Sequence, residues 1–241
     1  MREPLLSWLE LMPAPIPRIL PDLWFRFPAS EPRIYLTFDD GPHPEHTPAL
    51  LNLLDQHSAR ATFFMVGSQA QKHRKLVQRV ARNHSIANHT WNHLRLRGQS
   101  YDVIASQLER TRVLLEELSQ SVTEFFRPPY GVLGRTLLRY ARQQGHQIVM
   151  WDVLPWDFLS HRTADHIIAC LINKVRPGSI VVLHDGHKCA PKMIAALRVA
   201  LPVLKARGFV FDPLPHRESR AALSGLTNHA PGRILPENWN T

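Results

Sequence analysis

The chain has 241 residues and a mass of 27.6 kDa; 44% of its residues are apolar and 20% are charged, which is ordinary for a globular protein large enough for one α/β domain. Lys and Arg outnumber Asp and Glu by 29 to 20, but these basic residues are dispersed along the sequence without a helix or finger signature of nucleic-acid binding. We therefore expect no nucleic-acid partner, and the two cysteines exclude a disulfide framework.

The N-terminal segment is rich in proline. Residues 1–32 contain seven prolines with aromatic residues between them, which predicts an extended arm packed on the domain and not a separate domain. The first apolar stretch is short and broken by Pro4 and Glu10, so it does not resemble a signal peptide, and no run approaches a membrane span. We expect a cytoplasmic monomer without a transmembrane segment, with association with the cell envelope as the alternative location.

Strand-like and helix-like segments alternate from residue 33 onwards. The predicted strands are 33–38, 60–66, 85–88, 124–126, 146–153, 179–183 and 208–211; the predicted helices are 47–57, 71–82, 100–119, 134–144, 163–175 and 190–207. About seven strands alternating with six helices predict an α/β fold with a parallel sheet, open or closed into a barrel. We expect the folded domain to cover residues 33–212, and residues 213–241 to form a polar C-terminal tail.

Two acids, Asp39 and Asp40, stand at the end of the first predicted strand of the domain, just before Gly41-Pro42. Two negative charges at so short a distance repel each other. Burial of either carboxylate also costs free energy unless a cation or hydrogen bonds compensate it. A strand end has no structural need for both. The pair therefore predicts a positive partner, and a metal ion is one candidate.

Polar residues also follow four later strands. They are His89 and His93, Arg127 with Tyr130, Asp152 and Asp157, and His184 with Asp185. In βα folds the carboxyl ends of the parallel strands converge on one face, so these groups are predicted to meet in one site.

The histidine pair is a candidate for metal binding. His89 and His93 are four residues apart, so on a helical turn both imidazoles would face the same way. With one carboxylate they would make the His₂-Asp set of an open zinc-type site.

These motifs, in this order and spacing, resemble the polysaccharide deacetylase family, which is the nodulation-type chitooligosaccharide deacetylase homology domain, also called carbohydrate esterase family four. The resemblance covers roughly residues 33–212, and the segments that carry it are Thr37–Pro42, Ala61–Gly67, His89–His93, Arg127–Tyr130 and Leu183–Asp185. It implies an irregular (β/α) barrel of about seven parallel strands with surrounding helices. It also implies a metal-dependent hydrolase that removes N-acetyl, or possibly O-acetyl, groups from an acetylated glycan.

The resemblance also implies a role for each residue. Asp40, His89 and His93 would bind the metal, typically Zn²⁺, with Co²⁺ or Ni²⁺ as alternatives. Asp39 would be the general base, oriented by Arg127. The backbone N–H of Tyr130 would stabilise the oxyanion, and His184, tuned by Asp157, would protonate the leaving amine.

The fourth motif departs from the family pattern Asp-x-x-Asp-Trp, because Leu154 replaces the first acid and Phe158 replaces the tryptophan. Trp91 and Trp156 are candidates for stacking against sugar rings. Two other functions stay open: a cytosolic small-amide hydrolase on the same scaffold, and a catalytically weak carbohydrate-binding relative.

Overall fold

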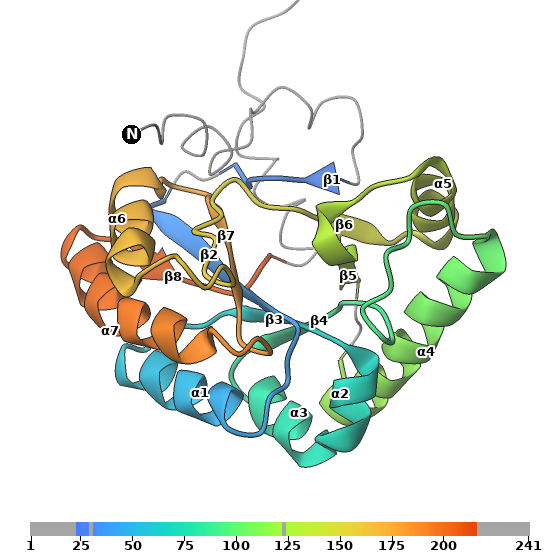
Figure 1. The fold of residues 1–241 in the computed structure, drawn as a ribbon, viewed down its shortest axis with the longest axis horizontal. Helices are drawn as coiled ribbons and strands as arrows, with labels where there is room; N and C mark the ends of the chain where they lie inside the picture. Colours follow the sequence, from blue (N-terminus) through green and yellow to red (C-terminus); the bar gives the residue numbers. More distant parts are fainter. Residues whose placement is uncertain (1–22, 29–30, 122–123, 216–241) are drawn as a thin grey trace, which may run out of the picture.

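The computed structural model describes residues 23–28, 31–121 and 124–215, which form a curled sheet of parallel strands with helices around it (Figure 1). The strands are β1 (Leu23–Trp24), β2 (Arg33–Asp39), β3 (Thr62–Met65), β4 (Ser85–Asn88), β5 (Phe125–Phe126), β6 (Gln147–Val149), β7 (Ile180–His184) and β8 (Val210–Phe211).

From β2 onwards, helices connect the successive strands. They are α1 (His46–Gln56), α2 (Gly67–Lys72), α3 (Arg74–Ala81), α4 (Tyr101–Ser119), α5 (Arg135–Gln144), α6 (Ala164–Lys174) and α7 (Ala190–Ala206), with a 3₁₀ turn at Pro129–Gly131. Among the helices of the described residues, none is both long enough and apolar enough to cross a bilayer.

The strand order is β1-β6-β5-β4-β3-β2-β7, β8 pairs with β2, and all of these ladders are parallel. The sheet curls so far that the segment after β6 reaches β7, where Val153 and Val181 form a parallel bridge. The irregular (β/α) barrel of about seven parallel strands is thus confirmed. Its curvature brings the carboxyl ends of the strands together on one face.

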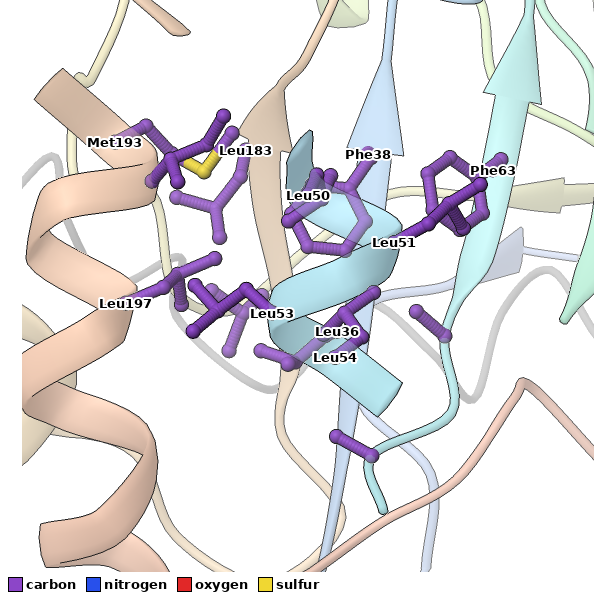
Figure 2. Close-up of a cluster of buried hydrophobic side chains, with 14 of the residues drawn as sticks. Leu36, Phe38, Leu50, Leu51, Leu53, Leu54, Phe63, Leu183, Met193 and Leu197 are labelled. Atoms are coloured by element: carbon purple, nitrogen blue, oxygen red, sulfur yellow. The ribbon is translucent and has the colours of Figure 1, made fainter. Parts of the chain in front are cut away.

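The core lies between the sheet and its outer helices. Strand β2 is buried almost throughout, as expected for a parallel strand covered on both faces. Leu50 and Leu54 of α1 belong to the same buried cluster as Phe38 of β2 and Leu197 of α7. Figure 2 shows α1 lying across β2, between α7 and β3, so that this packing holds the strand that ends in Asp39.

Two features differ from the sequence-based prediction. The single helix predicted over 71–82 is two helices, α2 and α3, because His73 leaves the helical region with φ −122° and ψ 42°. Strand β1 lies inside the proline-rich arm and pairs with β6, which the sequence did not indicate because the strand has two residues. The rest of that arm and the tail beyond residue 215 lie outside the described residues, so the domain boundaries stay a prediction.

Asp152 ties the end of β6 to β7. Its carboxylate is buried and accepts hydrogen bonds from the N–H of Ile180 at 2.8 Å and from the Ser179 hydroxyl at 3.0 Å; Arg176 lies 3.7 Å away. Burial raises the pKa of Asp152 against the opposing effect of these hydrogen bonds. This strand-end acid therefore serves the closure of the barrel.

Removal of this carboxylate tests that role. We expect Asp152→Ala to lower the free energy of unfolding by about 1–3 kcal/mol, because the buried N–H of Ile180 and hydroxyl of Ser179 lose their acceptor. Urea denaturation of the purified variant measures the loss. Asp55→Ala, at an exposed position of α1, is the control and should change stability by less than about 0.5 kcal/mol. Equal free energies of unfolding for the two variants would contradict the role of Asp152 in closing the barrel.

Candidate active site

The two acids at the end of β2 point to different partners. Asp39 is the last residue of the strand and is buried, and its Oδ1 accepts a hydrogen bond from Arg127 Nη1 at 2.6 Å. Asp40 has a left-handed backbone (φ 73°), a conformation that aspartate tolerates better than most residues. This turn in the backbone separates the two carboxylates.

Arg127 is fully buried and every arm of its guanidinium is occupied. Nη1 also donates to the Thr37 hydroxyl at 2.8 Å, Nε donates to the Val149 carbonyl at 3.0 Å, and Nη2 donates to the Met150 carbonyl at 2.9 Å. Its plane lies over the Phe64 ring, 4.1 Å from the centroid. The sequence-based expectation that a rigid arginine holds Asp39 agrees with these contacts.

Asp40, His89 and His93 form a cluster whose candidate ligand atoms all lie within 4.8 Å of one another. The prediction that a helical turn presents the two histidines is wrong. Residues 89–93 form an irregular loop in which Thr90 (φ 67°) and His93 (φ 59°) are left-handed. The imidazoles converge because the loop reverses direction, not because of helical periodicity.

The spacing of these atoms suits a metal ion. Asp40 Oδ1 lies 3.1 Å from His93 Nε2 and 3.5 Å from His89 Nε2. Ligands about 2.0–2.2 Å from a tetrahedral zinc ion lie roughly 3.3–3.6 Å apart. Among the described residues, Asp40 Oδ1 is a buried oxygen without a hydrogen-bond partner. The residues therefore fit a divalent cation.

The tautomer of His89 supports the same conclusion. Its Nδ1 lies 2.8 Å from the Arg127 carbonyl oxygen, which can only accept, so Nδ1 carries the hydrogen. Nε2 is then the ring nitrogen that faces the carboxylate of Asp40, at a spacing that lets both bind one cation. Such support of the second ring nitrogen is the rule for metal-binding histidines.

The side chain of Tyr130 supports the other histidine. Its hydroxyl lies 3.2 Å from His93 Nδ1, and the two rings meet edge to face with centroids 4.7 Å apart. The sequence assigned only the backbone N–H of Tyr130 to the site. The hydroxyl contact depends on the left-handed conformation of Tyr130 (φ 62°), which no sequence pattern revealed.

The charge of Asp40 is strongly favoured in this setting. Burial by itself raises the pKa of its carboxyl group, but the rings of His89 and His93 and the charge of His184 outweigh burial. The pKa of Asp40 therefore lies well below its usual range, and the carboxylate stays ionised as a ligand must.

His184 ends β7 and pairs with Asp157. Its Nδ1 lies 2.9 Å from Asp157 Oδ1, and its backbone N–H donates to Asp157 Oδ2 at 2.8 Å. Burial by itself lowers the pKa of His184, but the charge and hydrogen bond of Asp157, with the charges of Asp40 and Asp39, raise it to about 9. At neutral pH the imidazole is therefore a proton donor.

These groups open into one cavity of about 330 Å³. Its lining comprises Asp39, Asp40, His89, His93, Pro128, Tyr130, Gly131, Trp151, Leu154, Trp156, Phe158, Val182, His184 and His187. One wall is apolar, and the Phe158 ring meets His184 edge to face at 4.9 Å. Of the two tryptophans expected there, Trp156 lines the cavity, whereas Trp91 stacks on Arg110 at 3.6 Å.

Gly186 and Thr47, which were not predicted, also shape the site, together with Asp185, which was. A Cβ on Gly186 would lie 2.3 Å from the backbone oxygen of Asp40, so only glycine fits there. Asp185 is buried against Gly41 and accepts a hydrogen bond from Thr47, and burial raises the pKa of its carboxyl group to about 7. A glycine two residues after the strand-end histidine was the one local signal available.

Comparisons with known proteins agree with this geometry. A family model described as polysaccharide deacetylase matches residues 27–149. A chitooligosaccharide deacetylase of Azorhizobium caulinodans is 35% identical over 205 residues, which covers 79% of this chain and 96% of that protein.

Solved structures are similar over the same region. A peptidoglycan N-acetylglucosamine deacetylase in complex with 4-naphthalen-1-yl-N-oxidanyl-benzamide is 34% identical with a TM-score of 0.76, covering 80% of this chain and 91% of that one. A family 4 acetyl xylan esterase from Clostridium thermocellum, in complex with a cobalt ion, is 30% identical with a TM-score of 0.72, covering 80% and 92%.

The hydroxyl of Tyr130 can be tested by itself. We expect Tyr130→Phe to lower the affinity for Zn²⁺ about 10- to 100-fold, because His93 loses the partner that orients its ring. Isothermal titration calorimetry with Zn²⁺ measures this directly. Tyr101→Phe removes a hydroxyl from α4, where it accepts from Gln144, and serves as the control. Wild-type affinity in Tyr130→Phe would refute the contact's importance.

Gly186 offers a second test of the cluster. Gly186→Ala should lower Zn²⁺ affinity by about 10- to 100-fold, because the new methyl group displaces the backbone of Asp40. Gly134→Ala is the control, since its Cβ would meet atoms no closer than 3.4 Å. If both variants bind Zn²⁺ as tightly as the wild type, the backbone approach does not control the position of Asp40.

Proposed function

The chain belongs to the polysaccharide deacetylase family, and we propose that it hydrolyses N-acetyl groups of an acetylated sugar polymer or oligosaccharide with a divalent metal ion. It is a hydrolase of the deacetylase class, as are the relatives described above. The observation that carries the metal dependence is the convergence of Asp40, His89 and His93 beside an Asp39 that is held separately by Arg127.

Asp40, His89 and His93 would hold the metal, for which we propose Zn²⁺. When bound, such an ion lowers the pKa of a water molecule toward about 7 and polarises the acetyl carbonyl. Sites of two histidines and one carboxylate accept several divalent ions, so Co²⁺ and Ni²⁺ are alternatives. The cobalt ion in the acetyl xylan esterase structure supports this range.

Asp39 would act as the general base. Its Oδ1 is occupied by Arg127, whereas Oδ2 lies 3.9 Å from His89 Nε2 and so borders the metal-binding cluster. In the proposed reaction Oδ2 of Asp39 takes a proton from the attacking water while the water oxygen bonds to the acetyl carbon. The ion pair with Arg127 orients the carboxylate of Asp39 and fixes which oxygen is available.

The remaining groups would act on the oxyanion and the leaving amine. The backbone N–H of Tyr130 would donate to the carbonyl oxygen as negative charge develops on it. Protonated His184, held by Asp157, would give its proton to the amide nitrogen as the C–N bond breaks. The products would be acetate and a free amino sugar.

The location and the oligomeric state stay predictions. Cell fractionation tests the expected cytoplasmic location against the cell envelope, and light scattering tests the expected monomer.

Variants of the two neighbouring acids should separate their roles. We expect Asp40→Ala and His93→Ala to abolish both bound Zn²⁺ and acetate release. Asp39→Asn should keep the metal and lose about 10²- to 10⁴-fold in rate, because only the proton acceptor is lost. Metal analysis and acetate release from acetylated oligosaccharides, with Zn²⁺, Co²⁺ and Ni²⁺ supplied in turn, measure these effects.

His57→Ala is the matched control, because His57 lies at the C-terminal end of α1, away from the site. Unchanged metal content in His93→Ala would overturn the proposed metal site. Acetate release confined to a panel of small amides would favour the small-amide hydrolase. Glycan binding without acetate release with any of the metals would favour the carbohydrate-binding relative.

A further inference from the structure

The positive charge of this chain is concentrated in one stretch of sequence. Residues 56–101 contain eight Lys or Arg residues, namely Arg60, Lys72, Arg74, Lys75, Arg79, Arg82, Arg95 and Arg97, and neither Asp nor Glu. This stretch alone carries a formal charge of +8, while the whole chain has +9. Along the sequence these residues look dispersed, but the fold gathers several of them.

The corner between α2 and α3 forms a groove with the loop that leads into α1. Its lining comprises Pro44, Pro48, Gln71, Lys72, His73, Arg74, Lys75, Leu76 and Arg79, and its volume is about 600 Å³. Four of these nine residues are Lys or Arg, and no acidic residue lines the groove. Figure 1 shows α1, α3 and α2 side by side along one edge of the molecule.

The lysines of this groove are available to a ligand. Arg74 already pairs with Glu117, and Arg79 donates to the Asn52 side chain at 2.7 Å. Lys72 and Lys75 are exposed, and neither forms an ion pair with any residue in the described ranges. Two uncompensated ammonium groups beside two arginines produce a local field that attracts anions.

The groove lies next to the active site. Pro44 is four residues from Asp40, so their Cα atoms are at most about 14 Å apart. Helix α2 starts against the loop of the histidine pair, since the N–H of Gly67 donates to the Thr90 carbonyl at 2.9 Å and the N–H of Ser68 donates to the Trp91 carbonyl at 2.8 Å. The six residues of α2 rise about 9 Å from there to the groove.

We propose that this groove binds a carboxylate or phosphate group carried by the glycan substrate, several sugars away from the acetyl group that is hydrolysed. The substrate is therefore an anionic acetylated glycan. This inference rests on the proposed deacetylase function, and it adds a second contact through which the chain selects its substrate. Lys72 and Lys75 would recognise the anion by charge, and the positive charges of Arg74 and Arg79 would add to the local field.

A charge-reversed pair tests the groove. The variant Lys72→Glu/Lys75→Glu is compared with Arg142→Glu/Arg198→Glu, which makes the same change in net charge at exposed positions of α5 and α7. The substrates are a neutral chitotetraose and an acidic tetrasaccharide that alternates N-acetylglucosamine with glucuronic acid. We expect the groove variant to raise KM for the acidic substrate about 10-fold, with kcat and all values for chitotetraose unchanged.

Binding is also measured without turnover. Isothermal titration calorimetry of the acidic tetrasaccharide with metal-free protein should show the same loss, about 10-fold in Kd, in the groove variant alone. If the two variants lose affinity equally, net charge and not the groove is responsible, and the proposal fails. It also fails if only the binding of phosphatidylglycerol vesicles weakens in the groove variant, because the groove then serves a membrane surface.

The same measurements test the groove and the deacetylase function separately. Acetate release from chitotetraose with no preference for the acidic substrate leaves the deacetylase function standing and overturns the groove. Groove-dependent binding of the acidic tetrasaccharide without acetate release from either substrate overturns the deacetylase function and leaves the anion-binding groove standing.

Discussion

The buried ion pair between Arg127 and Asp39 is the constraint on which the site depends. A guanidinium taken fully out of water is tolerable only when its charge and its donors are matched, and removing one partner of such a pair typically costs about 3–5 kcal/mol. Here the match comes from Asp39 and Thr37 of β2 and from the carbonyls of Val149 and Met150 at the end of β6. The arginine therefore locks opposite sides of the curled sheet in one arrangement, and the Arg127 carbonyl also fixes the ring of His89.

Around this fixed point the backbone is strained. Seven non-glycine residues of the described chain have positive φ, and five of them border the site: Asp40, Thr90, His93, Tyr130 and Trp156. Such conformations cost about 1–3 kcal/mol each and persist only where the surroundings impose them. The hydrogen bonds from the start of α2 to the 89–93 loop, and the close approach of Gly186 to Asp40, are surroundings of this kind. Strain here means that the side chains are held in place before a ligand arrives.

The two adjacent acids therefore have different partners. Asp39 continues the strand and turns inward to Arg127, whereas the left-handed backbone of Asp40 turns its carboxylate toward two imidazoles. Asp40 Oδ1 and His89 Nε2 face each other at 3.5 Å, a spacing that suits a shared cation. Repulsion between neighbouring carboxylates is relieved by giving each a separate positive partner. In the proposed reaction, this separation gives proton transfer to Asp39 and metal binding to Asp40.

The sequence by itself determined the class of fold and predicted most of the residues that line the candidate site, because the succession of strand-like and helix-like segments and the polar residues that end each strand are local features. It did not reveal β1, the break at His73, the hydroxyl of Tyr130, or the role of Asp152 in closing the barrel. It placed the histidine pair on a helical turn that does not exist, and it left the basic residues of 56–101 dispersed. Only the tertiary structure decided these points, because left-handed loop conformations and long-range hydrogen bonds set where a side chain points, and neither leaves a periodic trace in the sequence.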